Sequence, residues 1–218
     1  MSIEGAIFDM DGTLIESMHL WQNIAYRYLK EKYRIIPTNE EKKKMQGMMM
    51  EELGDTMISL YSLPTTREQI VKDINKMTEI GYFHEVHKKP YVEKILISLK
   101  EKGIPMCIAT ATEYYLTDGC LKRLGLKKYF DKIFTCHDYH TTKYGPVLFN
   151  EAGKFLGTKK ENTFVFEDTL DSIHGAKEAG FPVIAVPDRW QRKDREEIKK
   201  AADFFIESFK EFPSLNLL

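Results

Sequence analysis

The sequence lacks the features that mark a nucleic-acid-binding or a membrane protein. It has 32 lysine and arginine residues against 33 aspartate and glutamate residues, so its formal net charge is only −1. No excess of positive charge is therefore present to attract nucleic acid or an anionic membrane. No apolar run approaches the roughly 20 residues that a membrane-spanning helix needs, and no signal-like segment precedes Asp9. We expect a cytoplasmic protein that binds neither nucleic acid nor membrane.

Cysteine is scarce as well. The three cysteines, Cys107, Cys120 and Cys136, are an odd number and lack the spacing of metal ligands. Cys107 also lies in an apolar run that predicts a buried strand. We therefore interpret all three as free thiols in a reducing compartment. At 218 residues, the chain is long enough for one large core or for a core and a small second domain.

Two carboxylates follow an apolar run near the start of the chain. Asp9 and Asp11 come directly after residues 6–8, and Gly12 allows the backbone to turn close to them. Because side chains alternate along a strand, two acids two residues apart lie on the same side. Ligands bind at the carboxyl ends of the strands of an open α/β sheet, where one carboxylate can act as a nucleophile and the other can transfer protons. A solvated acidic turn is the alternative for this pair alone.

Two later positions suit phosphate binding. Thr110 ends the apolar run 104–109, and backbone N–H groups from Ala111 onward open a predicted helix. A hydroxyl together with the free N–H groups of a helix start can bind phosphate. Lys143 precedes another helical run and supplies a compact cation. Each residue also has an ordinary interpretation, as a helix cap for Thr110 and as a solvated loop residue for Lys143.

A second pair of acids follows another apolar run. Glu167 and Asp168 come directly after residues 163–166. Adjacent carboxylates at the end of a strand suit a hard cation such as Mg²⁺, which prefers oxygen ligands and keeps several waters. A helix cap is the alternative here too, so the pair alone does not establish a metal site.

The order of apolar patterns predicts an α/β fold with an inserted helical domain. Beyond residue 89, strand-like runs alternate with helical runs, which predicts a doubly wound, Rossmann-like parallel sheet. The predicted strands are 105–109, 132–135, 163–166 and 182–185, and the predicted helices are 92–101, 115–124, 147–156 and 171–178. The preceding stretch has only helical periodicity. We therefore expect a core domain of residues 1–16 and 89–218 and a helical domain of residues 17–88.

Taken together, these motifs resemble those of the haloacid dehalogenase-like hydrolase superfamily, subfamily IA. The resemblance rests on residues 8–14, Thr110, Lys143 and residues 166–168. The form of the last motif and the downstream run 175–180 resemble the branch that contains β-phosphoglucomutase and small phosphosugar phosphatases. The resemblance implies that the helical domain is a mobile cap that controls access of water and substrate.

The resemblance also implies roles for the acids. Asp9 would be the nucleophile, Asp11 the general acid and base, and Thr110 and Lys143 the groups that hold and neutralise the phosphate. Mg²⁺ would be bound by Asp9, the backbone carbonyl of Asp11, Glu167 and Asp168, with Glu167 acting partly through water. Asp171 lies one residue before the position of a further acid in many relatives, so we leave it out of the ligand set.

One departure from the branch separates a hydrolase from a mutase. The hexose-phosphate mutases place an arginine three residues after a cap glycine, and here Gly47 is followed at that distance by Met50. An uncharged thioether cannot hold a second phosphate. We therefore expect a monomeric, Mg²⁺-dependent phosphatase of small phosphate monoesters such as phosphosugars, with Gly12, Ala111 and Met50 next to the substrate. A phosphosugar mutase and a non-catalytic binder of a phosphorylated ligand are the alternatives.

Overall fold

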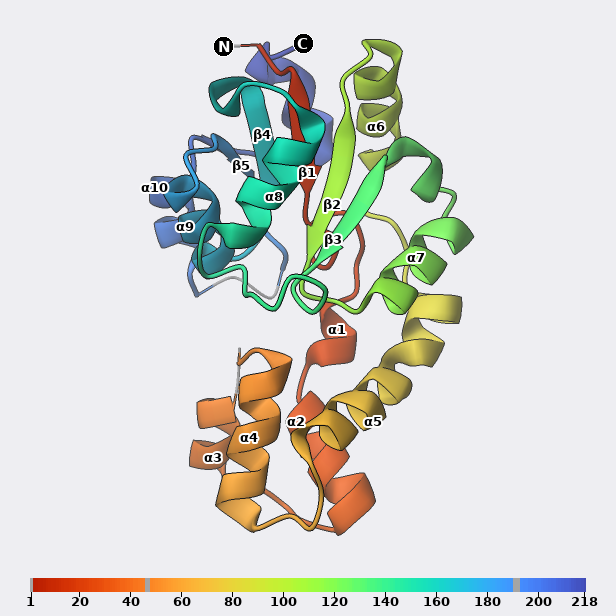
Figure 1. The fold of residues 1–218 in the computed structure, drawn as a ribbon, viewed down its shortest axis with the longest axis vertical. Coiled ribbons are helices and arrows are strands. Elements are labelled where there is room, and N and C mark those ends of the chain that lie inside the picture. The colour runs from red at the N-terminus through yellow and green to blue at the C-terminus, as the bar shows by residue number, and fades with distance from the viewer. Residues whose placement is uncertain (1, 46–47, 190–192) are drawn as a thin grey trace. The chain divides into compact units, whose positions relative to one another are not determined.

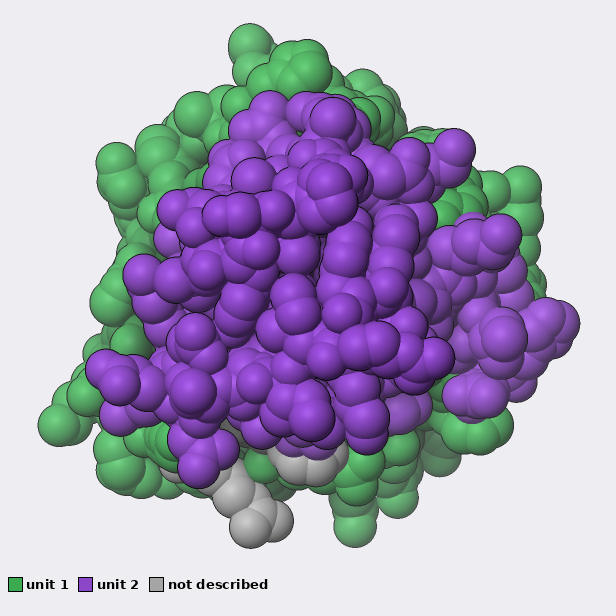
Figure 2. All heavy atoms as spheres, turned by 90° about the horizontal axis from the view of Figure 1, so that it is seen from below, with its two compact units in different colours: residues 1–18, 86–218 green, residues 19–85 purple. Residues whose placement is uncertain are grey.

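The computed structural model describes residues 2–45, 48–189 and 193–218. Gly47, the glycine of the predicted cap motif, lies outside these residues. The chain forms two compact units, one made of residues 1–18 and 86–218 and the other of residues 19–85, which Figure 2 shows in different colours. The second unit lies within the segment predicted as a helical domain.

The larger unit is built on a parallel sheet of six strands in the order β3-β2-β1-β4-β5-β6 (Figure 1). The strands are β1 (Gly5–Phe8), β2 (Met106–Thr110), β3 (Lys132–Thr135), β4 (Thr163–Glu167), β5 (Val183–Ala185) and β6 (Phe204–Phe205). This topology confirms the predicted doubly wound parallel sheet. The predicted bounds of β3 are also those of the structure, and the other predicted strands agree within a residue.

Helices cover the sheet, whose central strands are mostly apolar and are buried along their whole length. They are α6 (Val92–Glu101), α7 (Tyr114–Arg123), α8 (Val147–Leu156), α9 (Leu170–Glu178) and α10 (Arg195–Ala201), with 3₁₀ turns at Lys127–Tyr129, Lys160–Asn162 and Phe209–Leu215. α8 packs against β1, β2 and β3, in front of the sheet in Figure 1, and α9 packs against β4 and β5. The rings of Phe8 and Phe166 stack with centroids 4.2 Å apart, and Phe209 and Phe212 pack against Phe166. Cys107, Cys120 and Cys136 are buried and free, as predicted.

The two chain segments that lead to and from the helical unit are paired with each other. Ile15 and Lys88 form an antiparallel bridge, and the N–H of Glu16 donates to the carbonyl of His87 at 2.9 Å. The N–H of Lys89 donates to the carbonyl of Leu14 at 2.8 Å. The chain therefore leaves the larger unit and returns to it at one place.

The helical unit has an apolar core of its own. Its helices are α1 (Met18–Trp21), which begins at the last residue before the unit, α2 (Ile24–Tyr28), α3 (Asn39–Met45), α4 (Met50–Tyr61) and α5 (Arg67–Ile80). Two π-helical turns lie at Leu29–Tyr33 and Gly81–Glu85. Met57, Ile70 and Ile74 are fully buried at its centre, and Met50 is half-buried against this core. Among the described residues, no helix is both long and apolar enough to cross a membrane.

Candidate active site

The sheet topology places two groups of predicted residues side by side. The chain runs from β1 to β2 on one side and from β4 to β5 on the other, so the carboxyl ends of β1 and β4 flank the point where a doubly wound sheet binds ligands. Asp9 follows β1, and its N–H donates to the carbonyl of Phe166 in β4 at 3.0 Å. Glu167 ends β4 and Asp168 follows it. The two acidic motifs therefore meet at adjacent strand ends.

Lys143 is buried between the two motifs. Its Nζ lies 2.7 Å from Asp9 Oδ1 and forms a second ion pair with Glu167 Oε1. Burial by itself would lower the pKa of this lysine, but the carboxylates of Asp9 and Glu167 raise it above its ordinary value. Lys143 therefore stays protonated and holds one oxygen of each acid.

A glycine in α9 allows this lysine to be placed. A Cβ on Gly175 would lie 2.2 Å from the backbone oxygen of Lys143 and 3.0 Å from that of Gly145. Both atoms belong to the backbone, so they cannot move aside as a flexible side chain would. Gly175 thus lets α9 pack directly against the loop that carries Lys143, which gives a physical reason for a glycine at this position.

Asp9, Glu167 and Asp168 form a buried carboxylate cluster, with one oxygen of each within 4.8 Å of the others. Within the described part of the chain, Asp9 Oδ2, Asp168 Oδ2 and Glu167 Oε1 are buried without a hydrogen-bond partner, and Glu167 Oε1 is ion-paired with Lys143. Glu167 is more fully engaged, because Oε2 accepts the N–H groups of Asp168 at 2.9 Å and Thr169 at 3.2 Å. Asp168 therefore has more free capacity to bind a cation directly than Glu167 has.

The charges of the cluster are not balanced by the protein. Burial, opposed by Lys143 and reinforced by Glu167 and Asp11, raises the pKa of Asp9 from 3.8 to about 7. Burial, reinforced by Asp9 and Glu167, also raises the pKa of Asp168 well above its ordinary value. Three buried carboxylates share one buried lysine, and two of their oxygens are free. This donor set fits a hard divalent cation such as Mg²⁺.

The turn after β1 approaches the cluster closely at Gly12. Its φ is 82°, and a Cβ there would lie 2.2 Å from Asp168 Oδ2. A side chain would thus be strained and would also occupy the space beside the free carboxylate oxygen. The glycine predicted from the sequence as a turn residue is required for a second reason, the proximity of Asp168.

Asp11 lies outside the cluster and is held by hydroxyl groups. Ser17 Oγ donates to Asp11 Oδ1 at 2.5 Å, and Thr112 Oγ1 donates to Oδ2 at 2.7 Å. The N–H of Thr112 in turn donates to Thr110 Oγ1 at 3.1 Å. Thr112 thus connects the predicted phosphate-binding hydroxyl to the predicted acid and base, with the exposed Ala111 between the two threonines.

Motifs in the sequence indicated no role for Ser17 or Thr112. Thr112 was visible as a second hydroxyl two residues after Thr110, whereas nothing in the sequence marked the contact of Ser17 with an acid six residues earlier. The use of the Asp11 carbonyl as a metal ligand stays a prediction. Met50 belongs to the helical unit, and its predicted place next to the substrate stays a prediction.

Comparison with known proteins identifies the family. The model of the haloacid dehalogenase-like hydrolase family matches residues 6–186. The chain belongs to the haloacid dehalogenase-like hydrolases. It is 27% identical over 178 residues to a phosphorylated carbohydrates phosphatase of Thermotoga maritima, covering 82% of each chain. It is 29% identical over 188 residues to the pyrophosphatase PpaX of Halalkalibacterium halodurans, covering 85% of this chain and 84% of the relative.

Solved structures of other proteins share the fold. The structure of CbbY from Rhodobacter sphaeroides in complex with phosphate superposes with a TM-score of 0.81 over 96% of both chains, at 22% identity. At this identity the likeness shows the fold alone. The predicted resemblance to the family is thereby confirmed by the family model, and the architecture by the structure.

Asp171, His137 and His140 of this hydrolase are not members of the carboxylate cluster found among the described residues. Asp171 is exposed in the first turn of α9, and among the described residues the cluster of metal-ligating side chains contains Asp9, Glu167 and Asp168. His137 Nδ1 lies 3.6 Å from Glu113 Oε1, and its ring centroid is 6.5 Å from that of His140.

Proposed function

We propose that the protein is a Mg²⁺-dependent phosphatase that hydrolyses small phosphate monoesters through a phosphorylated Asp9. The observation that carries this proposal is the state of the Asp9 carboxylate. Lys143 holds Oδ1 at 2.7 Å, while Oδ2 is buried without a hydrogen-bond partner among the described residues. One oxygen is thus oriented and the other is available to attack. Relatives named as a phosphatase of phosphorylated carbohydrates and as a pyrophosphatase support phosphate transfer to water.

The residues that would hold the metal are Asp9, Asp168 and Glu167, together with the backbone carbonyl of Asp11. Mg²⁺ bound there supplies positive charge that offsets the repulsion between a phosphate dianion and a carboxylate nucleophile. Asp168 would bind directly through its free Oδ2. Glu167, with both oxygens engaged by Lys143 and by backbone N–H groups, would bind through water.

The protein residues divide the reaction into two displacements. An oxygen of Asp9 forms a bond to phosphorus while the ester P–O bond breaks, and Asp11 gives its proton to the departing alkoxide. Asp11 then takes a proton from the water that attacks the phosphorylated Asp9, which releases inorganic phosphate and restores the carboxylate. Thr110 and Lys143 hold the phosphoryl oxygens during both steps.

We propose the helical unit as the cap and Met50 as a substrate-facing residue in it. The absence of a cation at this position favours monophosphates, and a phosphosugar is the substrate class that the Thermotoga relative suggests. The alternative function, a phosphosugar mutase, is tested with β-glucose 1-phosphate. We expect release of phosphate, and formation of glucose 6-phosphate faster than that release would favour a mutase.

The proposal is tested by measuring phosphate release from a panel of phosphorylated metabolites with and without Mg²⁺. We expect Asp9→Asn to lower kcat by at least about 100-fold, a loss of about 3 kcal/mol of transition-state stabilisation. Asp138→Asn makes the same chemical change at an exposed loop residue and should leave the rate unchanged. Full activity after removal of metal by EDTA, or more than about a hundredth of the rate in Asp9→Asn, would refute the mechanism.

A further inference from the structure

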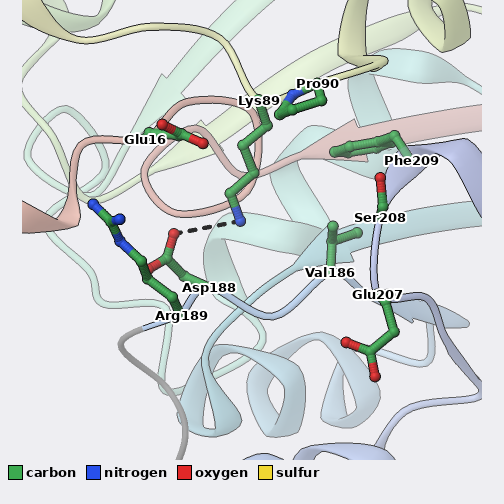
Figure 3. A pocket seen from close by; sticks show the side chains of 9 residues that line it. All are labelled: Glu16, Lys89, Pro90, Val186, Asp188, Arg189, Glu207, Ser208 and Phe209. Carbon is green, nitrogen blue, oxygen red and sulfur yellow. Dashed lines mark ion pairs between the residues drawn. The ribbon is translucent and has the colours of Figure 1, made fainter.

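A pocket of about 280 Å³ opens at the carboxyl end of β5, the strand that pairs with β4 and its Glu167. Val186 forms part of its wall, and its N–H donates to the carbonyl of Glu167 at 2.8 Å. Figure 3 shows Lys89 and Asp188 pointing toward each other in this pocket, with Glu16 and Arg189 nearby. None of these charged residues has a role in the mechanism above.

Lys89 and Asp188 form an ion pair that is largely removed from water. Lys89 Nζ lies 3.4 Å from Asp188 Oδ2, and the side chains are 13% and 6% exposed. The backbone of Lys89 is fixed by its hydrogen bond to Leu14, so only the flexible side chain can change position. Among residues 2–45, 48–189 and 193–218, Asp188 is the acid that pairs with Lys89.

The charge of Lys89 reaches the metal cluster. Burial, Asp9 and Glu167 raise the pKa of Asp168, and Lys89 is the first of the groups that oppose this rise. Leu14, to which the Lys89 backbone is bonded, lies two residues after Gly12, the residue that touches Asp168. Besides Glu16 in the same pocket, a lysine in this position has Asp188 and the free carboxylate oxygen of Asp168 within its electrostatic reach.

We propose that Asp188 is a positioning residue that holds Lys89 away from Asp168 and so keeps the Asp168 carboxylate open to Mg²⁺. This inference rests on the proposed use of Mg²⁺. When the charge of Asp188 is removed, the Lys89 ammonium loses its partner and pairs with Asp168. An ammonium on that carboxylate competes with the cation for the same oxygen and repels its charge.

The test is calorimetric titration of Mg²⁺ into the full chain without substrate. We expect Asp188→Asn to raise the Kd for Mg²⁺ by about 10-fold to 100-fold, as for other residues that orient metal ligands. The double variant Asp188→Asn with Lys89→Met removes the competing ammonium and should return the Kd to within about threefold of wild type. Asp188→Ser provides the same loss of charge if Asp188→Asn does not fold, as judged by its melting temperature.

Asp203→Asn is the matched control. Asp203 pairs with Lys177 at 2.6 Å and accepts the N–H of Val183 at the amino end of β5, the end away from the cluster. Its loss should leave the Kd unchanged. An unchanged Kd for Mg²⁺ in Asp188→Asn, the result if Lys89 turned to Glu16, would overturn the positioning role of Asp188 but not the proposed function. A double variant that still binds Mg²⁺ weakly would overturn the same role. Failure of the wild-type chain to bind Mg²⁺ would overturn the proposed metal dependence as well.

Discussion

At the scale of single residues, the two aspartates after β1 are held by different chemistry. Asp9 is bound by the buried ammonium of Lys143, whereas both oxygens of Asp11 accept hydrogen bonds from hydroxyl groups. A cation beside a nucleophile favours its ionised form and so opposes the burial that raises the pKa of Asp9. Hydroxyl groups orient a carboxyl group and can hydrogen-bond to it whether it is protonated or not. This difference suits one residue that attacks and one that exchanges protons.

The role of Thr112 can be isolated from its packing by two substitutions. Thr112→Val keeps the shape but removes the hydrogen bond to Asp11, so we expect kcat to fall about 10-fold, the effect of losing about 1.5 kcal/mol. Thr112→Ser keeps the hydroxyl and should retain most of the rate. Steady-state kinetics on one substrate would show the difference. Equal rates in both variants would mean that Thr112 does not position Asp11.

The raised pKa of Asp9 predicts how stability depends on pH in the absence of metal. The folded chain keeps the proton of Asp9 up to a pKa of about 7, whereas the unfolded chain releases it near 3.8. The folded state therefore binds more protons between these values, and Asp9 destabilises it increasingly as pH rises through this window. At about 1.4 kcal/mol for each pKa unit, the full effect is of the order of 4 kcal/mol.

Urea unfolding in EDTA would measure this effect. Relative to wild type, Asp9→Asn should be equally stable near pH 4 and more stable at pH 8, because the amide carries no charge to bury. A difference between the two proteins that stayed constant from pH 4 to pH 8 would contradict the raised pKa.

At the scale of helices and strands, the sequence predicted the residues at strand ends better than it predicted short elements or residues that are placed by tertiary contacts. Apolar runs followed by acids located β1 and β4, because such runs are typical of central parallel strands. β6 has two residues and α10 buries only Ile198, so neither has a readable period and both were missed. The helical periodicity expected in residues 17–88 is interrupted at Asn23, where φ is 54°.

The same limit applies to the active site. Asp9, Lys143, Glu167 and Asp168 were assigned together from motifs, and the structure brings their side chains together. For Ser17 and Lys89 the sequence predicted only a place at the domain boundaries. Their contacts with Asp11 and Asp188 depend on how the folded chain packs, which periodicity does not encode.

The packing of α9 against the Lys143 loop gives a prediction at this scale. Gly175→Ala would place a methyl group 2.2 Å from the Lys143 carbonyl, so we expect a loss of about 1 to 3 kcal/mol of stability and a fall in kcat as Lys143 moves. Gly145→Ala adds a methyl group where no atom lies within 4 Å and should change stability by less than about 1 kcal/mol. Thermal unfolding and kinetics of both variants test this. Normal activity in Gly175→Ala would show that the contact does not position Lys143.

At the scale of the whole molecule, the chain consists of two units with separate cores joined by one pair of segments. All members of the carboxylate cluster and their partners belong to the larger unit, whereas Met50 belongs to the helical one. Chemistry and the proposed selection of substrate are thus encoded in different parts of the sequence.

Removal of the helical unit would separate these two functions. Because Ile15 and Lys88 are already paired, residues 19–85 can be replaced by a short Gly-Ser linker without stretching the chain. We expect the remaining unit to unfold cooperatively and to bind Mg²⁺ with an affinity near that of the full chain. We also expect it to lose discrimination among phosphate esters. Circular dichroism melts and Mg²⁺ calorimetry would check the first two outcomes, and a remainder that failed to fold would contradict the independence of the core.

The central claim is that phosphate is transferred to Asp9, and covalent trapping tests it most directly. The enzyme is mixed with Mg²⁺ and a substrate that it turns over, quenched in acid during steady state and reduced with borohydride, which converts an aspartyl phosphate to homoserine. Peptide mass spectrometry then locates the modified residue. We predict homoserine at residue 9 in the wild-type chain and none in Asp9→Asn. Homoserine at residue 11, or rapid turnover with no trapped residue, would contradict the account.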